Sequence, residues 1–507
     1  MKEELVQEIL MARQRVYAAA QPTPLEQVSI SSVEAEIFLK REDLSPINSY
    51  KWRGAFNRMA LLSSEERQRG VIAASAGNHA QGVALAAQKL RTHAKIFMPV
   101  STPRMKQVAV QLHGGDAVEI RLIGDTYDEA SAAAHAAAES EGGIFVHPYD
   151  DLATMGGQGT LADEIVMSGK GPFDVAYLQI GGGGMAGAVA CWLRTYWPEM
   201  RIVGVEGKDQ ASMKAAIESG KPTTLDYVDV FCDGTAVSRA GDLTYPLCRD
   251  LLDEIITVTN EEVSGAIQVL WETSRCIPEP SGAMGLAGLL KERKKLKGKR
   301  VLAIVCGANV DFAQLGLIAR HAGSGTARRR YLRFELDETP GAMLRLLQEY
   351  LGGLNITEFQ YGKVDMKWAW PVIGIDIRKA DFESLERKLQ EAGIPFADVT
   401  NQEDVEFRII HYRGRMMSQP FFFKLEFPER PGALHDFLLG VQPAANICYF
   451  NYIYTGERVG RALMGFEFEG EKERRQFQEV LRKSGYAHSE IQPEALSRIL
   501  SRPTDMF

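Results

Sequence analysis

Short runs of β-branched and aliphatic residues alternate with helix-length segments through the N-terminal part of the chain. The runs lie at 71–72, 95–98, 117–120, 144–146, 175–180, 202–205 and 301–305, and segment 126–141 is typical of the stretches between them. Two neighbouring parallel strands must be joined by a crossover connection of about this length. The pattern therefore predicts parallel α/β sheets, which bind ligands in the loops at the carboxyl ends of their strands.

The alternation stops near His321. Gly323-Ser324-Gly325 and Arg328-Arg329-Arg330 follow, and their small and polar character predicts a flexible junction between domains.

An internal repeat lies beyond the junction. Every matching pair is separated by 91 residues, so the repeat keeps its register over a long segment. The pairs are Leu336-x-Glu338-x-Pro340-Gly341-Ala342 with Phe427-x-Glu429-x-Pro431-Gly432-Ala433, Asn355-Ile356 with Asn446-Ile447, Phe359 and Tyr361 with Phe450 and Tyr452, and Gly374 with Gly465. Each copy is predicted to run strand, Pro-Gly turn, helix, two strands and helix, with first strands at 331–336 and 421–427. That is the order of a ferredoxin-like sandwich. Taken alone, each Pro-Gly would be only a turn that opens a helix.

Composition limits the class of protein. The 507 residues suffice for several domains, and 45% apolar residues, 24% charged residues and a net charge of -8 are typical of an ordinary globular protein. The acidic balance argues against a nucleic-acid partner, and the basic run 291–300 is interpreted as a solvated helix end. No secretion signal is visible at 1–20. The uncharged stretch 175–193 contains four glycines and is interpreted as strand, loop and helix rather than a membrane span.

Six cysteines are spread along the sequence without a C-x-x-C pair. This spacing fits neither a disulfide framework nor a zinc site, and it predicts a reducing, cytoplasmic location without a bound metal.

Four loops carry candidate chemistry. The first contains Lys51 between Tyr50 and Trp52, after Arg41-Glu42-Asp43. A lysine is usually a solvated surface charge, but a desolvated amine has a lowered pKa and can form an imine.

The second loop, Ser75-Ala76-Gly77-Asn78-His79, follows a predicted strand and opens an alanine-rich helix. Free backbone N–H groups at such a helix start can hold a carboxylate or a phosphate. An ordinary helix cap explains this loop equally well, and His79 could be a packed structural histidine.

The third loop is Gly181-Gly182-Gly183-Gly184-Met185, between a predicted strand and a helix of small residues. Backbone without side chains can wrap an anion at the positive end of a helix, so the loop predicts a phosphate site. It matches neither the P-loop nor the dinucleotide motif, which disfavours nucleotides.

The fourth loop follows the predicted strand 301–305 and begins with Cys306; Glu279 lies in a turn before another helix. A buried thiol is usually a small hydrophobe, and Glu279 could simply cap its helix.

Together, in this order, the four loops resemble fold type II pyridoxal-phosphate enzymes, most closely the threonine and serine dehydratases. With two repeats behind the catalytic body, the chain resembles the biosynthetic threonine dehydratases (threonine deaminases). The resemblance implies an α/β body of two parallel-sheet subdomains followed by two ferredoxin-like α+β, ACT-like domains. The implied domains are 1–325 with a smaller subdomain at about 52–155, then 329–411 and 419–501.

The resemblance also implies residue roles. Lys51 would hold pyridoxal 5'-phosphate as a Schiff base, release it to the amino group of threonine and then remove the α-proton. The implied cofactor contacts are Lys51, Tyr50, Asn78, Gly181, Gly182, Gly183, Gly184, Met185 and Cys306, and the implied substrate contacts are Ser75, Ala76, Gly77, Asn78, His79 and Glu279. Cys306 stands where most relatives carry a serine beside the pyridine nitrogen. A side chain that is not acidic does not keep that nitrogen protonated, which suits β-elimination better than transamination and leaves threonine and serine both open as substrates.

The predicted products are 2-oxobutanoate from threonine or pyruvate from serine, with ammonia. The ACT-like copies imply inhibition by isoleucine, antagonism or activation by valine, and a homotetramer. Gly341, Asn355, Gly432 and Asn446 mark the expected effector loops. Three alternatives remain: copies that serve oligomerisation alone, a racemase or synthase on the same fold, and an amino-acid sensor with a vestigial catalytic body.

Overall fold

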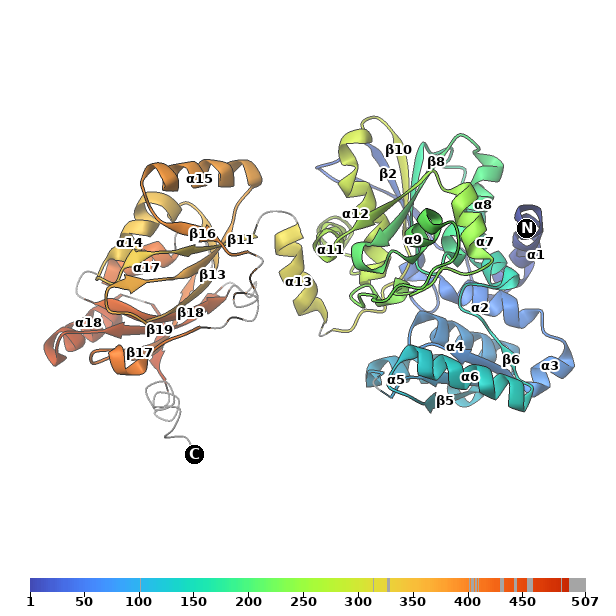
Figure 1. Cartoon of the computed structure of the whole chain (residues 1–507), viewed down its shortest axis with the longest axis horizontal. Coiled ribbons are helices and arrows are strands. Elements are labelled where there is room, and N and C mark those ends of the chain that lie inside the picture. Colours follow the sequence, from blue (N-terminus) through green and yellow to red (C-terminus); the bar gives the residue numbers. More distant parts are fainter. Residues whose placement is uncertain are drawn as a thin grey trace. The chain divides into compact units, whose positions relative to one another are not determined.

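The computed structural model describes residues 1–100, 102–312, 314–325, 329–400, 402, 405, 408, 410–428, 433–441, 445–453, 459–484 and 486–491. The chain forms two compact units, Met1–Gly325 and Thr326–Phe507 (Figure 1). Within the described residues, no helix is both long and apolar enough to cross a membrane.

The first unit contains a six-stranded sheet in the order β1-β2-β10-β7-β8-β9. All neighbours are parallel except β1 and β2. The strands are β1 (Leu25–Val28), β2 (Glu36–Arg41), β7 (Val175–Gln179), β8 (Arg201–Gly207), β9 (Glu254–Val258) and β10 (Arg300–Val305). The sequence analysis did not predict β1, β2 and β9, whereas β7, β8 and β10 fall on predicted runs.

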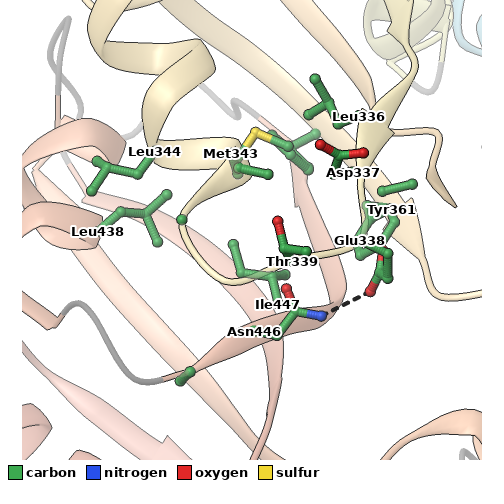
Figure 2. Close-up of a pocket in the computed structure, with 15 residues that line it drawn as sticks. Leu336, Asp337, Glu338, Thr339, Met343, Leu344, Tyr361, Leu438, Asn446 and Ile447 are labelled. Carbon is green, nitrogen blue, oxygen red and sulfur yellow. Dashed lines mark hydrogen bonds between the residues drawn. The ribbon is translucent and has the colours of Figure 1, made fainter. Parts of the chain in front are cut away.

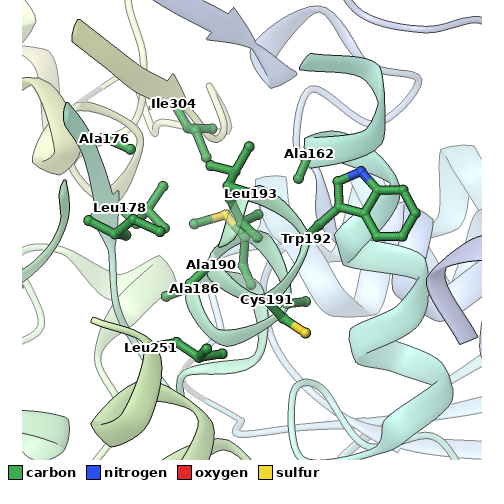
Figure 3. Close-up of a cluster of buried hydrophobic side chains, with 14 of the residues drawn as sticks. Ala162, Ala176, Leu178, Ala186, Ala190, Cys191, Trp192, Leu193, Leu251 and Ile304 are labelled. Atoms are coloured by element: carbon green, nitrogen blue, oxygen red, sulfur yellow. The ribbon is translucent and has the colours of Figure 1, made fainter. Parts of the chain in front are cut away.

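Helices cover both faces of this sheet because its strands are apolar on both sides. In β7, Ala176 and Leu178 face one core, while Val175 and Tyr177 face the other. Figure 3 shows the first core, where Ala176 and Leu178 lie near Ala186. The helices of the first core are α1 (Lys2–Ala19), α7 (Leu152–Met167), α8 (Gly184–Tyr196), α9 (Ser212–Ser219) and α10 (Thr244–Leu251). Those of the second are α11 (Asn260–Ser274), α12 (Pro280–Lys291) and α13 (Gln314–Gly325).

A second, four-stranded sheet in the same unit is wholly parallel and has the order β5-β4-β3-β6. Its strands are β3 (Val71–Ala74), β4 (Ala94–Met98), β5 (Val118–Leu122) and β6 (Ile144–Phe145). Its helices are α2 (Lys51–Ala60), α3 (Ser64–Arg69), α4 (Asn78–Leu90), α5 (Arg104–Gly114) and α6 (Tyr127–Glu141). The prediction of two parallel-sheet subdomains is thus confirmed.

The chain divides after Gly325, at the predicted junction, but Gly323-Ser324-Gly325 are helical rather than flexible. Helix α13 continues through these residues to Gly325. The helix continues because i→i−4 hydrogen bonds tolerate glycine and serine near a helix end at a small propensity cost. Arg329 and Arg330 begin strand β11, and Arg328 lies outside the described residues.

The described part of the second unit contains an antiparallel sheet of eight strands in the order β16-β11-β15-β13-β18-β19-β17-β20 and a separate antiparallel pair, β12-β14. The first copy comprises β11 (Arg329–Phe334), β12 (Leu336–Asp337), α14 (Ala342–Leu346), the π-helical η6 (Leu347–Leu351), β13 (Asn355–Gly362), β14 (Trp368–Ala369), β15 (Val372–Asp376), α15 (Lys379–Glu391) and β16 (Phe396–Asp398). The second comprises β17 (Phe421–Pro428), α17 (Ala433–Val441), β18 (Asn446–Ile453), β19 (Val459–Glu467), α18 (Glu471–Lys483) and β20 (His488–Glu490). Each copy has the predicted ferredoxin-like order.

The two copies join edge to edge through β13 and β18. Phe359 pairs with Tyr452, Gln360 with Asn451, and Tyr361 with Phe450. Exchanging the copies by the repeat of 91 residues leaves this register unchanged, so a pseudo-two-fold axis passes between Gln360 and Asn451. The rings of Phe359 and Phe450 stack at 4.3 Å across the junction. The repeat seen in the sequence is therefore also a symmetry of the sheet.

A buried ionic cluster fixes helix α2 in the first unit. Arg53 is fully buried and donates to Glu42 at 2.9 Å through Nε and through Nη2. It also donates to Glu164 at 2.5 and 3.0 Å, and Lys40 donates to Glu164 at 2.5 Å. A Cβ atom on Gly157 would lie 2.4 Å from the Arg53 carbonyl oxygen, so α2 and α7 approach each other closely. The cluster and the glycine together set the position of α2.

We predict that Arg53→Met destabilises α2 by about 3–5 kcal/mol, because Glu42 and Glu164 then share only Lys40 in a buried site. Hydrogen exchange of the α2 amides measures this loss. Arg58→Met in the same helix is the control. Its partner Asp151 lies 3.4 Å away and both side chains are partly exposed, so the change should be below about 1 kcal/mol. Equal effects of the two variants would contradict the prediction.

Candidate active site

Seven segments that are distant in the sequence line one cavity of about 420 Å³ in the first unit. The cavity lies where β7 and β10 end and where α2, α4, α8 and α12 begin. Its lining residues are Tyr50, Lys51, Asn78, Tyr149, Gln179, Gly181, Gly182, Gly183, Gly184, Met185, Ala186, Gly234, Thr235, Glu279 and Cys306. The carboxyl ends of parallel strands are the expected place for a ligand in this class of sheet.

Lys51 is the first residue of α2, and its amine is desolvated. Burial lowers the pKa of the Lys51 amine, and the carboxyl groups of Glu279 and Asp233 oppose part of that shift. The nitrogen lies 5.8 Å from the centroid of the Tyr50 ring. A lowered pKa increases the fraction of neutral amine near pH 7, the form that attacks an aldehyde.

The glycine loop connects β7 to α8 and has no room for side chains. A Cβ on Gly182 would lie 2.4 Å from the Tyr149 ring, and one on Gly184 would lie 2.8 Å from the Tyr149 carbonyl oxygen. Gly183 has φ +92°, in the left-handed region that favours glycine. Thr244 donates to the Gly182 carbonyl at 2.5 Å.

The N–H groups in the first turn of α8 have no acceptor within the helix. Together with the glycine backbone they can surround an anion at the positive end of a 13-residue helix. An imine-forming amine and an anion seat in one cavity fit a small molecule that carries both an aldehyde and a phosphate. The residues present therefore fit pyridoxal 5'-phosphate.

Cys306 follows β10 and is a buried thiol. Burial raises its pKa far above the ordinary value, so the thiol keeps its hydrogen near pH 7. Its Sγ donates to the Ser281 carbonyl at 3.6 Å, and the Cys306 carbonyl accepts from the Tyr50 N–H at 3.1 Å. The second contact ties the end of β10 to the residue before Lys51.

Glu279, Asn78 and Asn309 form a hydrogen-bonded chain along one wall. Asn78 Nδ2 donates to Glu279 Oε1 at 2.7 Å, and Asn309 Nδ2 donates to Asn78 Oδ1 at 2.7 Å. Asn309 also donates to the Ile47 carbonyl at 2.8 Å. Burial raises the pKa of Glu279 to about 7, and the negative charge of Asp233 contributes to the increase. Glu279 can therefore exchange a proton near neutral pH, which its sequence context did not reveal.

The other predicted substrate residues do not line the cavity. Ser75, Ala76 and Gly77 form the turn before α4, in which Gly77 N–H donates to Ser75 Oγ at 3.2 Å. His79 is buried, with Nε2 2.9 Å from the Val146 carbonyl oxygen, and burial lowers its pKa to about 3. His79 is thus neutral and packed, and the roles assigned to these four residues remain predictions. Within the described residues, no cluster of three metal-ligating side chains occurs.

Five cavity residues were not predicted from the sequence: Tyr149, Gln179, Ala186, Gly234 and Thr235. Tyr149 follows β6, so the rule that ligands lie after strands could have found it. Gln179 is the last residue of a buried strand and carried no such signal. Its Nε2 donates to the Ile304 carbonyl at 3.0 Å.

Two family models match this chain. The family model "Pyridoxal-phosphate dependent enzyme" matches residues 16–307, and the model "C-terminal regulatory domain of Threonine dehydratase" matches residues 320–409 and 414–499. The chain is 38% identical over 500 residues to the biosynthetic L-threonine dehydratase of Haemophilus influenzae, covering 97% of this chain and 96% of that protein. It is 37% identical over 499 residues to the Escherichia coli protein of the same name, covering 96% of each.

Among solved structures, the processed form of threonine deaminase isoform 2 from Solanum lycopersicum matches with a TM-score of 0.61 and 39% identity. The match covers 63% of this chain and 89% of that one. Maize serine racemase matches with a TM-score of 0.58 and 30% identity, covering 62% and 95%.

We predict that Lys51 in the cofactor-free protein reacts with an aldehyde at a lower pH than ordinary lysines, whose pKa is about 10.4. Because the pKa of Lys51 is lowered, its neutral, reactive amine is present at a lower pH than that of the other lysines. Reductive methylation over a pH series, followed by mass spectrometry of peptides, measures this. The other lysines in the same digest are the internal control. If Lys51 is methylated over the same pH range as the other lysines, the prediction is contradicted.

Proposed function

The chain belongs to the biosynthetic threonine dehydratase family, and from that membership we propose a role for each group that lines the cavity. The protein is a pyridoxal-phosphate-dependent lyase that deaminates threonine for isoleucine biosynthesis, with allosteric regulation through its C-terminal unit. The observation that carries the residue roles is the placement of the Lys51 amine and the glycine loop in one cavity.

Pyridoxal phosphate, when bound, withdraws electrons from the α-carbon of the substrate amine. We assign its aldehyde end to Lys51 and its phosphate to Gly181–184 and Met185. Tyr50, Asn78 and Cys306 contact its ring in this assignment. Cys306 stays a neutral thiol, which gives the ring nitrogen a hydrogen-bonding partner without a negative charge.

Lys51 also acts as the base. Its amine is released when the substrate amine takes its place, and it then removes the α-proton. The lowered pKa increases the fraction of released amine that is neutral, which is the form that accepts the proton.

The turn 75–77 and the start of α4 hold the substrate carboxylate. The N–H groups at the start of this 13-residue helix favour an anion, and neutral His79 does not compete for it. Glu279, hydrogen-bonded to Asn78, orients the substrate and is able to exchange a proton. Loss of the β-hydroxyl as water, followed by hydrolysis, converts threonine to 2-oxobutanoate and ammonia, or serine to pyruvate and ammonia.

The effectors we propose are isoleucine as inhibitor and valine as its antagonist. Of the expected effector loops, Gly341 and Asn446 line one cavity of the second unit (Figure 2), Asn355 begins β13, and Gly432 lies outside the described residues. We further propose a cytoplasmic homotetramer. The six cysteines are all buried as free thiols, which supports a reducing compartment.

The first test is Lys51→Ala with threonine or serine as substrate. We expect kcat to fall by about 10³-fold or more, because both the covalent anchor and the base are lost. Release of 2-oxobutanoate or pyruvate measures activity, and loss of the visible absorbance of the bound cofactor reports the anchor. The exposed Lys89, whose Nζ donates to the Ala19 carbonyl at 3.2 Å, gives the control Lys89→Ala. Unchanged turnover in Lys51→Ala would refute the assignment.

The second test truncates the chain after Gly325, where the two units divide. We expect the remaining unit to release 2-oxobutanoate from threonine and to lose its response to isoleucine. Initial rates over an isoleucine series measure this, with the full-length chain as the control. Isoleucine inhibition that persists in the truncated form would contradict the regulatory role of the second unit.

A further inference from the structure

A turn from His147 to Asp150 follows strand β6 of the four-stranded sheet and leads to helix α7. Here the chain passes from the smaller subdomain to the helices of the six-stranded sheet. Within the turn, Tyr149 lines the proposed cofactor cavity and packs against the glycine loop, where a Cβ atom on Gly182 would lie 2.4 Å from its ring. The turn therefore joins the two subdomains beside the proposed phosphate seat.

The ring of His147 holds the turn together. Its Nδ1 atom accepts from the backbone N–H of Asp150 at 2.8 Å and from that of Tyr149 at 3.3 Å. The imidazole also meets the Tyr149 ring edge to face, with ring centroids 4.7 Å apart. A ring nitrogen that accepts hydrogen bonds carries no hydrogen of its own. Burial lowers the pKa of His147, so the ring is neutral near pH 7 and Nδ1 keeps this role.

The carboxylate of Asp150 connects the turn to helix α10. It accepts from three successive backbone N–H groups, those of Asp242 at 2.9 Å, Leu243 at 2.9 Å and Thr244 at 3.2 Å. N–H groups at the start of a helix have no acceptor within the helix, so a carboxylate there supplies one. A Cβ atom on Gly241 would lie 2.2 Å from Asp150 Oδ1, so glycine leaves the room that the carboxylate needs. Asp150 thus fixes the start of α10 relative to the turn.

Thr244, the first residue of α10, in turn holds the glycine loop. Thr244 is fully buried, and its hydroxyl donates to the Gly182 carbonyl at 2.5 Å. The C=O and N–H of one planar trans peptide point in opposite directions. The hydrogen bond to the Gly182 carbonyl therefore turns the N–H of the same peptide, which belongs to Gly183, away from Thr244.

The direction of that N–H matters for an anion. Hydrogen bonds weaken steeply as the N–H turns away from its acceptor, and those to a charged acceptor are the strongest. A small rotation of the peptide between Gly182 and Gly183 would thus weaken a contact to phosphate without moving any side chain of the cavity. The contacts of His147, Asp150 and Thr244 form one chain that opposes such a rotation.

We propose that His147 and Asp150 are positioning residues for the cofactor phosphate. His147 shapes the turn, Asp150 holds the start of α10, and Thr244 then directs the Gly183 N–H at the phosphate. The inference rests on the proposed placement of the phosphate at the glycine loop, and it adds the residues that orient the loop for this contact.

The test compares two aldehydes that differ only in the phosphate. Pyridoxal 5'-phosphate and pyridoxal can both form an imine with Lys51, so the ratio of their affinities isolates the contribution of the phosphate. The full-length chain, freed of cofactor, is titrated with each compound, and the visible absorbance of the imine gives Kd. In Asp150→Ala we expect the preference for the phosphorylated compound to fall about 10- to 100-fold, the range of one hydrogen bond to a charged group.

Asp151→Ala is the matched control. Asp151 is the next residue, and it caps a different helix, α7, by accepting from the Thr154 N–H at 2.7 Å. Loss of either cap should lower the melting temperature, but only Asp150→Ala should change the preference. An unchanged preference in Asp150→Ala, or an equal change in both variants, would show that Asp150 is only a helix cap and would overturn the proposal.

Two pairs of variants test the rest of the chain of contacts, and they decide the question if Asp150→Ala does not fold. His147→Asn keeps an acceptor close to the position of Nδ1 and should retain the preference, whereas His147→Leu has no acceptor and should lower it. Thr244→Ser keeps the hydroxyl and should retain the preference, whereas Thr244→Val removes the hydroxyl at similar volume and should lower it. Equal preferences within both pairs would contradict the proposal.

Phosphorus NMR of the holoenzyme gives a readout that does not depend on affinity. The resonance of the bound phosphate should shift in Thr244→Val and stay in place in Thr244→Ser, because only the first variant frees the Gly182 carbonyl. A resonance that is the same in both variants would count against the proposal. Equal affinities of the unaltered protein for the two aldehydes would instead overturn the proposed phosphate site itself.

Discussion

The paired burial of Arg53 with Glu42 and Glu164 is the interaction on which the catalytic cavity depends. Arg53 lies two residues after Lys51 in α2, and its guanidinium joins the segment after β2 to helix α7. A buried ion pair is costly to form, but once formed it is strongly destabilising to break. The cluster therefore holds the start of α2 at one place, and the Lys51 amine opens into the same cavity as the glycine loop.

The glycine loop is held in place by close packing and by one hydrogen bond. Its close contacts with Tyr149 leave no space for side chains, and Thr244 fixes the Gly182 carbonyl. The backbone N–H groups of the loop and of the first turn of α8 are then available to an anion. One charged cluster and one loop without side chains thus organise the two ends of the proposed cofactor site.

In the second unit, the two copies of the repeat pair with each other to form a shared sheet. The β13–β18 pairing makes one continuous sheet from two copies, and the cavity at their junction takes residues from both. The chemistry there is not symmetric: Lys363 stands at the repeat position occupied by Tyr454 in the second copy. The duplicated fold is therefore symmetric in its strand pairing but not in the charged side chains at the junction.

The sequence by itself determined the fold class, the duplicated regulatory region and the residues nearest the chemistry, because hydrophobic periodicity, glycine runs and a fixed repeat are local patterns. Local pattern pointed to Lys51 and the glycine loop, and the family resemblance assigned roles to Asn78, Glu279 and Cys306; all of them line one cavity. Only the tertiary structure showed the interactions between residues that are far apart in the sequence. The desolvation that shifts the pKa of Glu279 to about 7, the Arg53 cluster and the ion pairs of Lys363 with Glu338 and Glu467 each arise from elements far apart in the chain. Local sequence could not reveal them, because burial and charge pairing are properties of the packed chain rather than of any one segment.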